Sequence, residues 1–320
     1  MVSRKLITAA GLALVAALLL FGAGCTTTPQ PNATTPTPAA TGTPGSGNIL
    51  RIATTTSLDA TGLLEAVEGV YEPANNVDLQ FLAQGTGQSL DTARRCDADL
   101  VLVHAPALEQ TFIDQGYGIN ARCFAYNYFI IVGPENDPAG IRDMDPVDAF
   151  RQIYEAGTNN TPGVTFVSRG DNSGTHSAER TLWQRAGYNY TTQVQGQPWY
   201  IEIGQGMGET LTQTSERRGY TLSDEGTYLS FQSDLDLDVI VGQGPALLNR
   251  YSAMAMNPEK CPSAKVQDAN RFINWLISDE GQAFIGDFGA SEFGKPLFTP
   301  LNGTACADPQ FNCTCSVPIA

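Results

Sequence analysis

One local pattern occurs four times in this chain: a short apolar segment, a loop rich in glycine and hydroxyl residues, and then a helical pattern. The four loops are residues 54–57, 84–89, 168–176 and 204–208. In open α/β sheets, ligands bind at the carboxyl ends of the strands, where such loops meet. We therefore expect an α/β fold in which these four helix starts converge on one crevice.

The loop at 168–176 has the most specific chemistry of the four. It combines Arg169 with two glycines and three hydroxyl side chains, between an apolar run at 164–167 and a predicted helix at 177–185. A helix start presents unpaired N–H groups and a positive dipole end to an anion, and a guanidinium offers a fork of donors that fits an oxyanion. A helix cap beside a surface arginine has a similar composition, and this loop alone does not distinguish the two.

The charge of the chain limits its partners. It has 33 acidic and 18 basic residues and a formal net charge of −15. Nucleic-acid binding requires basic patches, so no nucleic acid is expected as a partner. An acidic protein repels anions at long range, so any anion site has to be local and shielded. The sequence has no metal-ligand spacing either, and we expect neither a metal nor a cofactor.

The first 25 residues have the pattern of a lipoprotein signal peptide. A basic start precedes an apolar run at 6–21, and small residues precede Cys25, as at the end of an export signal. Cys25 is the expected lipidation site, although Gly22 stands where such signals usually have leucine. The alternative is an uncleaved anchor helix. Both place the remainder outside the cytoplasmic membrane, and we expect it to be lipid-anchored at the outer face.

Composition and turns divide the remainder into a tether, two lobes and a tail. Residues 26–48 are rich in Thr and Pro and have no apolar period, so they are expected to form a disordered tether. Turn clusters near 134 and 244 predict two crossovers between lobes. The expected divisions are lobe I at 49–133 and 245–305, lobe II at 134–244, and a cysteine-rich tail at 306–320.

Six cysteines remain when Cys25 is set aside, and an even number in an exported chain predicts disulfides. We expect Cys96 to pair with Cys123 in the first lobe. The C-terminal cysteines are then expected to pair among themselves and with Cys261, which would attach the tail to the body of the protein. These C-terminal residues are Cys306, Cys313 and Cys315.

An exported serine hydrolase is a minor alternative, because Ser173 and His176 lie three residues apart, with Asp171 close by. A nucleophile needs its base within hydrogen-bond reach, and side chains at a helix start need not face one another. The sequence also lacks the G-x-S-x-G turn of many hydrolases. We therefore expect no enzyme activity.

Several motifs occur together in the order of one known family. They are residues 54–57, 85–88, 97–106, 168–176 and 204–208, followed by Gly289 and residues 295–298. With them the sequence resembles the solute-binding receptors of ABC importers, and among these the tungstate-binding branch, over roughly residues 49–301.

The resemblance implies a two-lobed, periplasmic-binding-protein-like (type II) fold, with helix-flanked mixed sheets and a double crossover hinge. It implies that the chain is a monomer that binds tungstate or molybdate between the lobes without a counter-metal. An ABC permease and its ATPase are the implied partners. The pattern from Arg169 to Thr175 is also similar to that of phosphate receptors, so a phosphate or sulfate receptor of the same fold is the alternative.

The resemblance and the loop chemistry together define a hypothetical site. Arg169 would pair with the anion, Asp171 would orient Arg169, and hydroxyls and backbone N–H groups would complete the shell. The expected ligands are Thr56, Ser57, Thr86, Ser168, Arg169, Asp171, Ser173, Gly174 and Thr175, with secondary positions at Thr55, Gly85, His104, Gly206 and Met207.

Selectivity is expected to depend on size and protonation. A large cavity would favour tungstate over sulfate, and hydrogen phosphate would be rejected for want of a free acceptor for its proton. His104 ends a strand that faces the predicted cleft, where an aspartate would be such an acceptor. Tungstate and molybdate are nearly the same in size and charge, so the sequence does not separate them.

Overall fold

The computed structural model describes residues 48–242, 244–302 and 306–319. The predicted signal peptide with Cys25, and the predicted tether up to residue 47, lie outside the described residues. Within the described part of the chain, no helix is long and apolar enough to cross a membrane.

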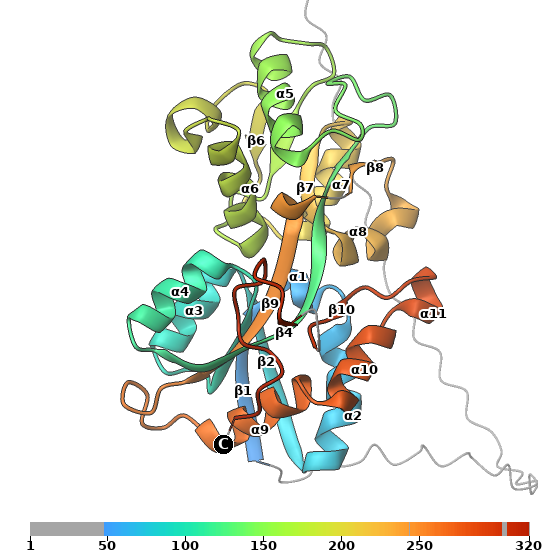
Figure 1. Cartoon of the computed structure of the whole chain (residues 1–320). Helices are drawn as coiled ribbons and strands as arrows, with labels where there is room; N and C mark the ends of the chain where they lie inside the picture. Colours follow the sequence, from blue (N-terminus) through green and yellow to red (C-terminus); the bar gives the residue numbers. More distant parts are fainter. Residues whose placement is uncertain (1–47, 243, 303–305, 320) are drawn as a thin grey trace, which may run out of the picture. The chain divides into compact units, whose positions relative to one another are not determined.

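The first lobe is built from strands and helices that come from both ends of the described chain (Figure 1). Its N-terminal elements are β1 (Asn48–Thr55), α1 (Thr56–Asp59), α2 (Leu63–Asn75), β2 (Val77–Gln84), α3 (Thr86–Arg94), β3 (Leu100–Val103), α4 (Pro106–Asp114) and β4 (Gly118–Gly133). Its C-terminal elements are β9 (Leu248–Met256), α9 (Val266–Leu276), α10 (Asp279–Asp287), α11 (Ala290–Phe293) and β10 (Thr299–Pro300).

The second lobe is formed by the middle of the chain. Its elements are α5 (Pro146–Thr158), β5 (Phe166–Ser168), α6 (Gly174–Arg185), β6 (Tyr200–Glu202), α7 (Met207–Arg217), β7 (Thr221–Asp224), α8 (Glu225–Phe231) and β8 (Asp238–Val241). Short π and 3-10 turns lie at Tyr190–Val194, Gln232–Asp234 and Pro245–Leu247.

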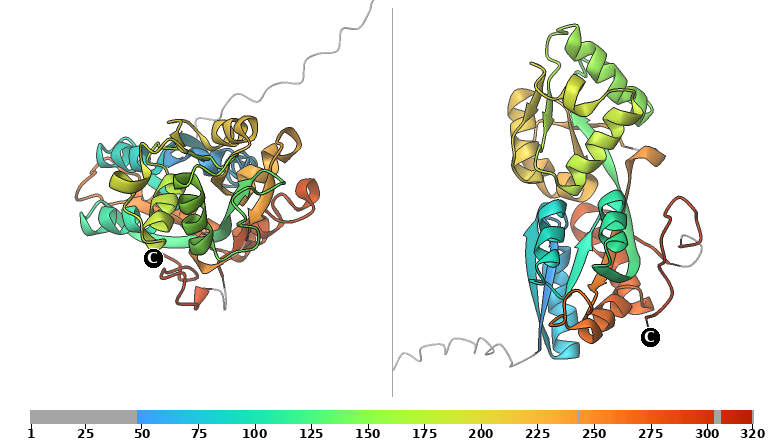
Figure 2. Two further views of the ribbon diagram at one scale, coloured as in Figure 1. Left: turned by 90° about the horizontal axis from the view of Figure 1, so that it is seen from above. Right: turned by 90° about the vertical axis from the view of Figure 1, so that its left-hand side faces the viewer.

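Strand β4 passes through both lobes (Figures 1 and 2). Its first part pairs antiparallel with β9, and its last residues pair antiparallel with β7 and β8. The main sheet has the order β10-β4-β9-β3-β1-β2, in which β1 runs parallel to β2 and β3, and β5 and β6 form a separate parallel pair. The predicted α/β, two-lobed fold is confirmed.

Alternating side chains on the strands reach two cores in each lobe, as the two-residue period of a strand requires. On β3, Leu100 and Leu102 face the core with α2 and α9, whereas Val101 and Val103 face the core that includes Phe112 of α4. On β4, Ile131 faces a core around Trp183, and its two neighbours face another core. Helices therefore cover both faces of each sheet.

Capping and strand pairing set the boundaries of two elements near the hinge between the lobes. Helix α8 begins at Glu225, because the buried Asp224 carboxylate caps it and accepts a hydrogen bond from the Thr227 N–H at 2.9 Å. Strand β4 begins at Gly118, because its first residues pair with β9 in spite of two irregularities in the register.

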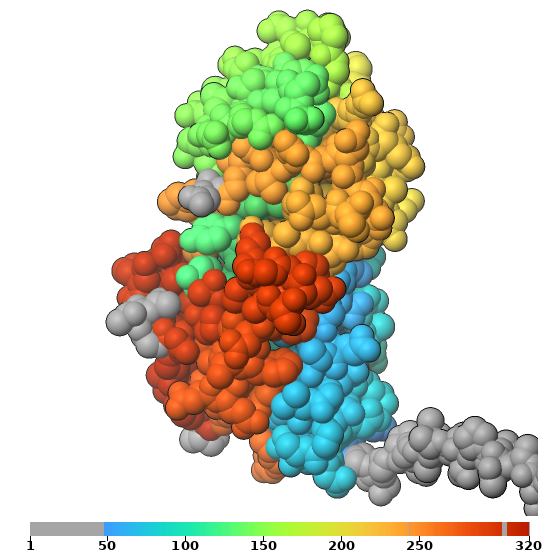
Figure 3. All heavy atoms as spheres, turned by 90° about the vertical axis from the view of Figure 1, so that its right-hand side faces the viewer, coloured from blue at the N-terminus to red at the C-terminus, as the bar shows by residue number. Residues whose placement is uncertain are grey.

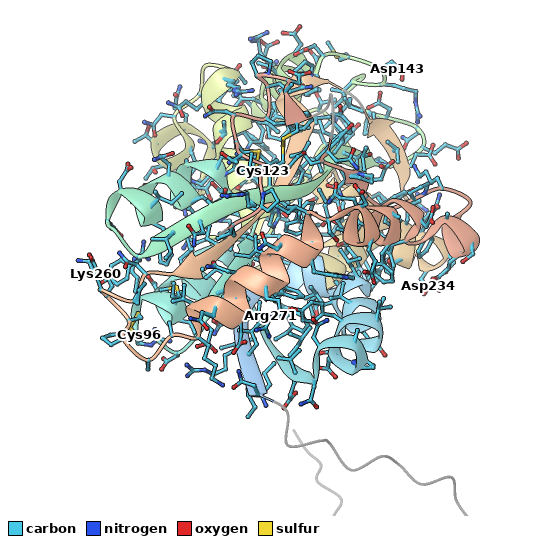
Figure 4. The ribbon with its side chains drawn as sticks, turned by 60° about the horizontal axis from the view of Figure 1, so that its bottom comes forward. Cys96, Cys123, Asp143, Asp234, Lys260 and Arg271 are labelled. Atoms are coloured by element: carbon cyan, nitrogen blue, oxygen red, sulfur yellow. A yellow bond between two sulfur atoms is a disulfide. The ribbon has the colours of Figure 1, made fainter. Side chains whose placement is uncertain are left out.

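The predicted pairing of Cys96 with Cys123 is wrong. Cys96 pairs with Cys261, Cys123 pairs with Cys313, and Cys306 pairs with Cys315. Cys96 follows α3 at one end of the lobe beside Lys260, and Cys123 lies in the middle of β4, away from it (Figure 4). The C-terminal cysteines therefore make one bridge among themselves and a second to β4, and Cys261 is not their partner.

The two lobes contact each other directly. The Lys295 ammonium, near the C-terminal end of the first lobe, lies 2.6 Å from the Glu225 carboxylate at the start of α8. Figure 3 shows this part of the C-terminal segment directly against the second lobe. At the opposite side of β4, the N–H of Gly87 in α3 donates to the carbonyl of Asn172 before α6, at 3.4 Å. The structure thus describes a closed arrangement of the lobes.

Candidate functional site

Arg169, at the end of β5, is the buried cation of the site, with a side chain only 2% exposed. Its Nε and Nη2 donate to Asp171 Oδ2 at 3.1 and 2.6 Å, and Nη2 also donates to Thr56 Oγ1 at 3.0 Å. Its Nη1 is buried and has no hydrogen-bond partner among the described residues. One edge of the guanidinium is thus fixed to both lobes, and its other NH₂ group is left with unused donors.

Close backbone approaches bring three of the four predicted loops together. A Cβ atom on Gly85 would lie 3.3 Å from the Asp171 carbonyl, and one on Gly174 would lie 2.6 Å from His104 Nε2. A side chain at Gly174 would require His104 or the backbone to shift, whereas one at Gly85 would be a tight contact. The helix starts of α1, α3 and α6 therefore meet around the Arg169 guanidinium.

The fourth loop is close to the same place but contributes less. Thr56 and Ala60 of the first lobe line one groove together with Gly206 and Met207 at the start of α7. The Met207 side chain is buried in the second-lobe core, where it packs with Ile130 and other apolar residues. The structure thus places Gly206 at the edge of the site and gives Met207 a place in the core.

Two of the predicted hydroxyls are engaged within their own loop. Ser168 Oγ donates to Glu179 Oε2 at 2.6 Å and accepts from the Gly170 N–H at 3.2 Å. Ser173 caps α6, because its Oγ accepts from the N–H of His176 at 3.2 Å. Both residues therefore shape the loop around Arg169.

Two other predicted hydroxyls are buried without a partner. Thr86 Oγ1, at the start of α3, and Thr175 Oγ1, at the start of α6, have no hydrogen-bond partner in the described part of the chain, and Arg169 Nη1 shares this property. A buried polar group without a partner costs about 1–3 kcal/mol. Three such groups at converging helix starts indicate a site built for a ligand that accepts hydrogen bonds.

Ser57 and His104 form a second polar cluster beside these groups. Ser57 Oγ lies 3.0 Å from His104 Nε2, and Thr55 Oγ1 lies 3.3 Å from Ser57 Oγ. His104 Nδ1 lies 2.8 Å from Asn249 Oδ1 on β9. Burial lowers the pKa of His104 to about 4, so this imidazole is neutral at neutral pH.

Sequence reasoning missed three buried polar residues that support the site. Asn249 reaches His104 from β9, and nothing in the sequence pointed to it. Asp224 caps α8, and burial raises its pKa while the Arg169 charge opposes the rise; an aspartate between an apolar run and a helix was the available signal. Glu179 lies inside α6, and no local pattern links it to Ser168, which is 11 residues earlier in the sequence.

Glu179 holds the loop from beneath. It is buried, and it accepts hydrogen bonds from Ser168 Oγ, from Trp183 Nε1 at 3.0 Å and from the Tyr200 hydroxyl at 2.5 Å. Burial raises the pKa of its carboxyl to about 7 in spite of these three donors. The end of β5 therefore rests on a carboxyl that changes charge near neutral pH.

The geometry does not support the hydrolase alternative at Ser173. The His176 ring accepts the Asn172 N–H at Nδ1, and its Nε2 lies 3.0 Å from the Tyr190 hydroxyl. Both ring nitrogens are thus engaged away from Ser173 Oγ. Among the described residues, no group of His, Cys, Asp or Glu could hold a metal ion.

A separate cavity of about 320 Å³ lies beside the hinge. Its lining includes Pro245 and Leu248 of the hinge segment, Arg250 of β9 and Phe311 of the tail. Of the predicted site residues, its lining includes His104 and Gly174. It does not include Arg169 or the two hydroxyls without partners.

Comparison with known proteins gives concordant matches. Residues 33–280 match a model described as a PBP superfamily domain. A Haloferax volcanii protein that carries the name of an ABC transporter anion-binding protein is 40% identical, over 96% of this chain and 88% of its own. The tungstate-binding protein TupA of Peptoclostridium acidaminophilum is 37% identical, over 81% of this chain and 87% of its own. The solved structure of the tungstate-binding protein TupA from Desulfovibrio alaskensis G20 matches with a TM-score of 0.66 and 39% identity, over 79% of this chain and 99% of that one.

Replacing either hydroxyl that lacks a partner should not weaken the anion-free fold. We expect Thr86→Val and Thr175→Val to leave the free energy of unfolding unchanged or to raise it by up to about 1–3 kcal/mol, because each removes an unsatisfied buried group. Thr227→Val is the matched control, since that buried hydroxyl donates to Asp224 at 2.9 Å, and it should lose about 1–3 kcal/mol. Urea unfolding in anion-free buffer measures all three, and equal losses in Thr86→Val and Thr227→Val would contradict the assignment.

Glu179 should make stability depend on pH. Its pKa in the folded state, about 7, lies above the ordinary value of 4.5, so the folded protein holds a proton that the unfolded chain releases. The protonated Glu179 therefore contributes to the free energy of unfolding. This contribution is fully present below pH 4.5 and is lost as pH rises through 7, by about 3 kcal/mol in total. Unfolding titrations between pH 4.5 and 8 should therefore show a flatter profile for Glu179→Gln than for the wild type. Identical slopes would show that Glu179 is not responsible.

Proposed function

The chain belongs to the PBP superfamily, and we propose that it is the extracytoplasmic receptor of an ABC importer that captures tungstate between its two lobes. The observation that carries this proposal is a set of buried donors, Arg169 Nη1, Thr86 Oγ1 and Thr175 Oγ1, that have no partner in the part of the chain that the structure describes. Tetrahedral oxyanions accept hydrogen bonds on every side, as such a set requires. Relatives that share more than a third of their residues with this chain carry the name of tungstate-binding protein.

The charge of the protein fits capture by local contacts. A net charge of −15 repels a dianion at a distance, so the site has to supply its binding energy from desolvated, preorganised donors. The guanidinium is held in place by Asp171 and Thr56 before the anion arrives. Fixed donors of this kind lose little entropy on binding.

The size of the ligand limits the expected affinity. Very small ligands reach at most about 1.5 kcal/mol per heavy atom, or about 7.5 kcal/mol for a five-atom oxyanion, which corresponds to binding in the micromolar range. Binding tighter than this would require an unusually rigid and dry site in the closed state.

The choice among oxyanions is part of the proposal. Molybdate has nearly the same size and charge as tungstate and is the expected second ligand. Sulfate and phosphate receptors of the same fold are the alternative, since the hydroxyls around Arg169 would also donate hydrogen bonds to those anions. A cavity too large for sulfate, and a wall without a free acceptor for the proton of hydrogen phosphate, would exclude both.

We further propose how the receptor is placed in the cell. Residues 1–25 would be a signal peptide ending at the lipidated Cys25, and residues 26–48 would tether the binding lobes to the outer face of the cytoplasmic membrane. Lobe I would comprise residues 49–133 and 245–305, lobe II residues 134–244, and the tail residues 306–320. The monomer would deliver its anion to an ABC permease driven by an ATPase.

Removal of the Arg169 charge tests the function directly. We expect Arg169→Ala to weaken tungstate binding by about 2–5 kcal/mol, or roughly 30- to 5,000-fold, as for other buried charge pairs that lose one partner. Titration calorimetry with tungstate, molybdate, sulfate and phosphate gives the affinities for both proteins. Arg217→Ala, at the end of α7, is the matched control, because it removes an arginine from an exposed pair with Gln213.

The same titrations distinguish the alternatives. Wild-type binding of phosphate or sulfate in preference to tungstate would replace the proposed ligand and keep the fold and the site. Normal tungstate binding by Arg169→Ala would show that the site lies elsewhere. Turnover of a chromogenic ester that is lost in Ser173→Ala would favour the hydrolase alternative.

A further inference from the structure

We propose that Ser57 is a wall of the cleft and not one of its hydrogen-bond donors, because a chain of side chains through Asn127, Asn249 and His104 draws its hydroxyl proton away from the anion. The sequence pattern predicted Ser57 as a ligand, since it lies in the first of the four loops. The inference rests on the proposed function for the identity of the anion. The hydrogen-bond chain itself can be tested without any anion.

The buried hydroxyls of the candidate site differ in whether the protein gives them a hydrogen-bond partner. Thr86 Oγ1 and Thr175 Oγ1 are buried without a partner among the described residues. Ser57 Oγ is also fully buried, but it has His104 Nε2 at 3.0 Å and Thr55 Oγ1 at 3.3 Å. Hydroxyls kept for a ligand remain unsatisfied in its absence, whereas the Ser57 hydroxyl is already satisfied by the protein.

A backbone carbonyl determines which atom donates in each hydrogen bond of this series of side chains. The carbonyl of Leu297 can only accept, so the Asn127 group that contacts it at 3.4 Å is its Nδ2 donor. Asn127 then presents Oδ1 to Asn249, which donates from Nδ2 at 2.8 Å. Asn249 in turn presents Oδ1 to His104 Nδ1 at 2.8 Å. An amide oxygen has no proton to donate, so His104 carries its proton on Nδ1.

The direction of the Ser57 hydrogen bond follows from the chemistry of a neutral imidazole. When Nδ1 is protonated, Nε2 is a bare acceptor, and Ser57 is the residue that donates to it. His104 stays neutral because it is enclosed: its ring stacks on Tyr251, with centroids 5.1 Å apart, and Gly174 closes over its Nε2 side. Burial lowers its pKa to about 4, which keeps this arrangement at neutral pH.

The remaining neighbour of Ser57 is Thr55. Thr55 caps α1, and its Oγ1 accepts the Leu58 N–H at 3.3 Å. Since the Ser57 proton is directed to His104, the contact between the two hydroxyls requires Thr55 to donate and Ser57 to accept. This wall therefore offers the anion no side-chain proton. Asn127 and Asn249 are positioning residues, because they act on the anion only through His104 and Ser57.

A nucleophile, an imidazole and a third polar side chain are connected in the same order in some hydrolases, as in the Ser-His-Asp and Cys-His-Asn triads. A general base works best with a pKa near the operating pH, and the pKa of His104 lies well below that. Ser57 is also fully buried. The connectivity here serves to hold a hydroxyl still.

The first test reads the protons directly. The chain has two histidines, so imidazole ¹⁵N NMR of the full-length protein at pH 7 can be assigned with a single His176→Gln variant. We expect His104 to be protonated on Nδ1 and bare at Nε2, and to remain neutral down to about pH 5. An Nε2-protonated or charged His104 at pH 7 would overturn the inference, whatever the protein binds.

Breaking the hydrogen-bond series at Asn249 should move the His104 proton from one ring nitrogen to the other. In Asn249→Leu the acceptor for Nδ1 is lost, and we expect His104 to move its proton to Nε2 and donate to Ser57. Gln282→Leu is the matched control: it removes another buried amide of the first lobe, which donates to the carbonyls of Phe124 and Leu276, and it should leave the His104 spectrum unchanged. An unchanged spectrum in Asn249→Leu would overturn the inference, and if that variant does not fold, the wild-type spectrum still decides.

The second test is the affinity of the full-length protein for tungstate by calorimetry. Ser57→Ala should change the dissociation constant less than about threefold, whereas Thr86→Val should raise it about tenfold or more, the effect of one charge-assisted hydrogen bond. A loss in Ser57→Ala as large as that in Thr86→Val would overturn the inference, as would ester turnover that depends on Ser57. If the wild type binds no tungstate, the proposed function fails, and the NMR result still decides the role of Ser57.

Discussion

The structure depends on one buried guanidinium that is held on one side and left open on the other. Arg169 is fixed by Asp171 within its own loop and by Thr56 across the cleft, so it joins the two lobes without using Nη1. A buried charge is tolerated in a protein when it is paired and hydrogen-bonded. Asp171 supplies the pair, and the unused donors define where a second negative charge can bind.

The fold makes this arrangement possible at some cost in stability. Strand β4 carries the chain from one lobe to the other and pairs with β9 on one side and with β7 and β8 on the other, so the lobes can face each other across helix starts. Arg169 Nη1, Thr86 Oγ1 and Thr175 Oγ1 are then buried without a partner among the described residues, which opposes folding until an anion satisfies them. Functional sites often reduce the stability of a protein in this way, because the groups needed for function are not the most stabilising ones.

The sequence alone singled out the parts of the candidate site that depend on local chemistry. Arg169, Thr86 and Thr175 were predicted because a strand, a glycine-rich loop and a helix start leave a recognisable pattern. The partners of these residues were not predictable in the same way. Asn249 lies 145 residues from His104, Cys261 lies 165 residues from Cys96, and such pairs are decided by the sheet order, which local patterns do not contain.

The central claim is that an oxyanion completes the hydrogen bonds of Arg169, Thr86 and Thr175. The most direct measurement is the anomalous diffraction of tungsten in a crystal of the protein grown with tungstate. We expect one peak, with anion oxygens about 2.7–3.2 Å from Arg169 Nη1, Thr86 Oγ1 and Thr175 Oγ1. A peak in the cavity beside the hinge, lined by Arg250 and Phe311, with none at Arg169, would contradict it.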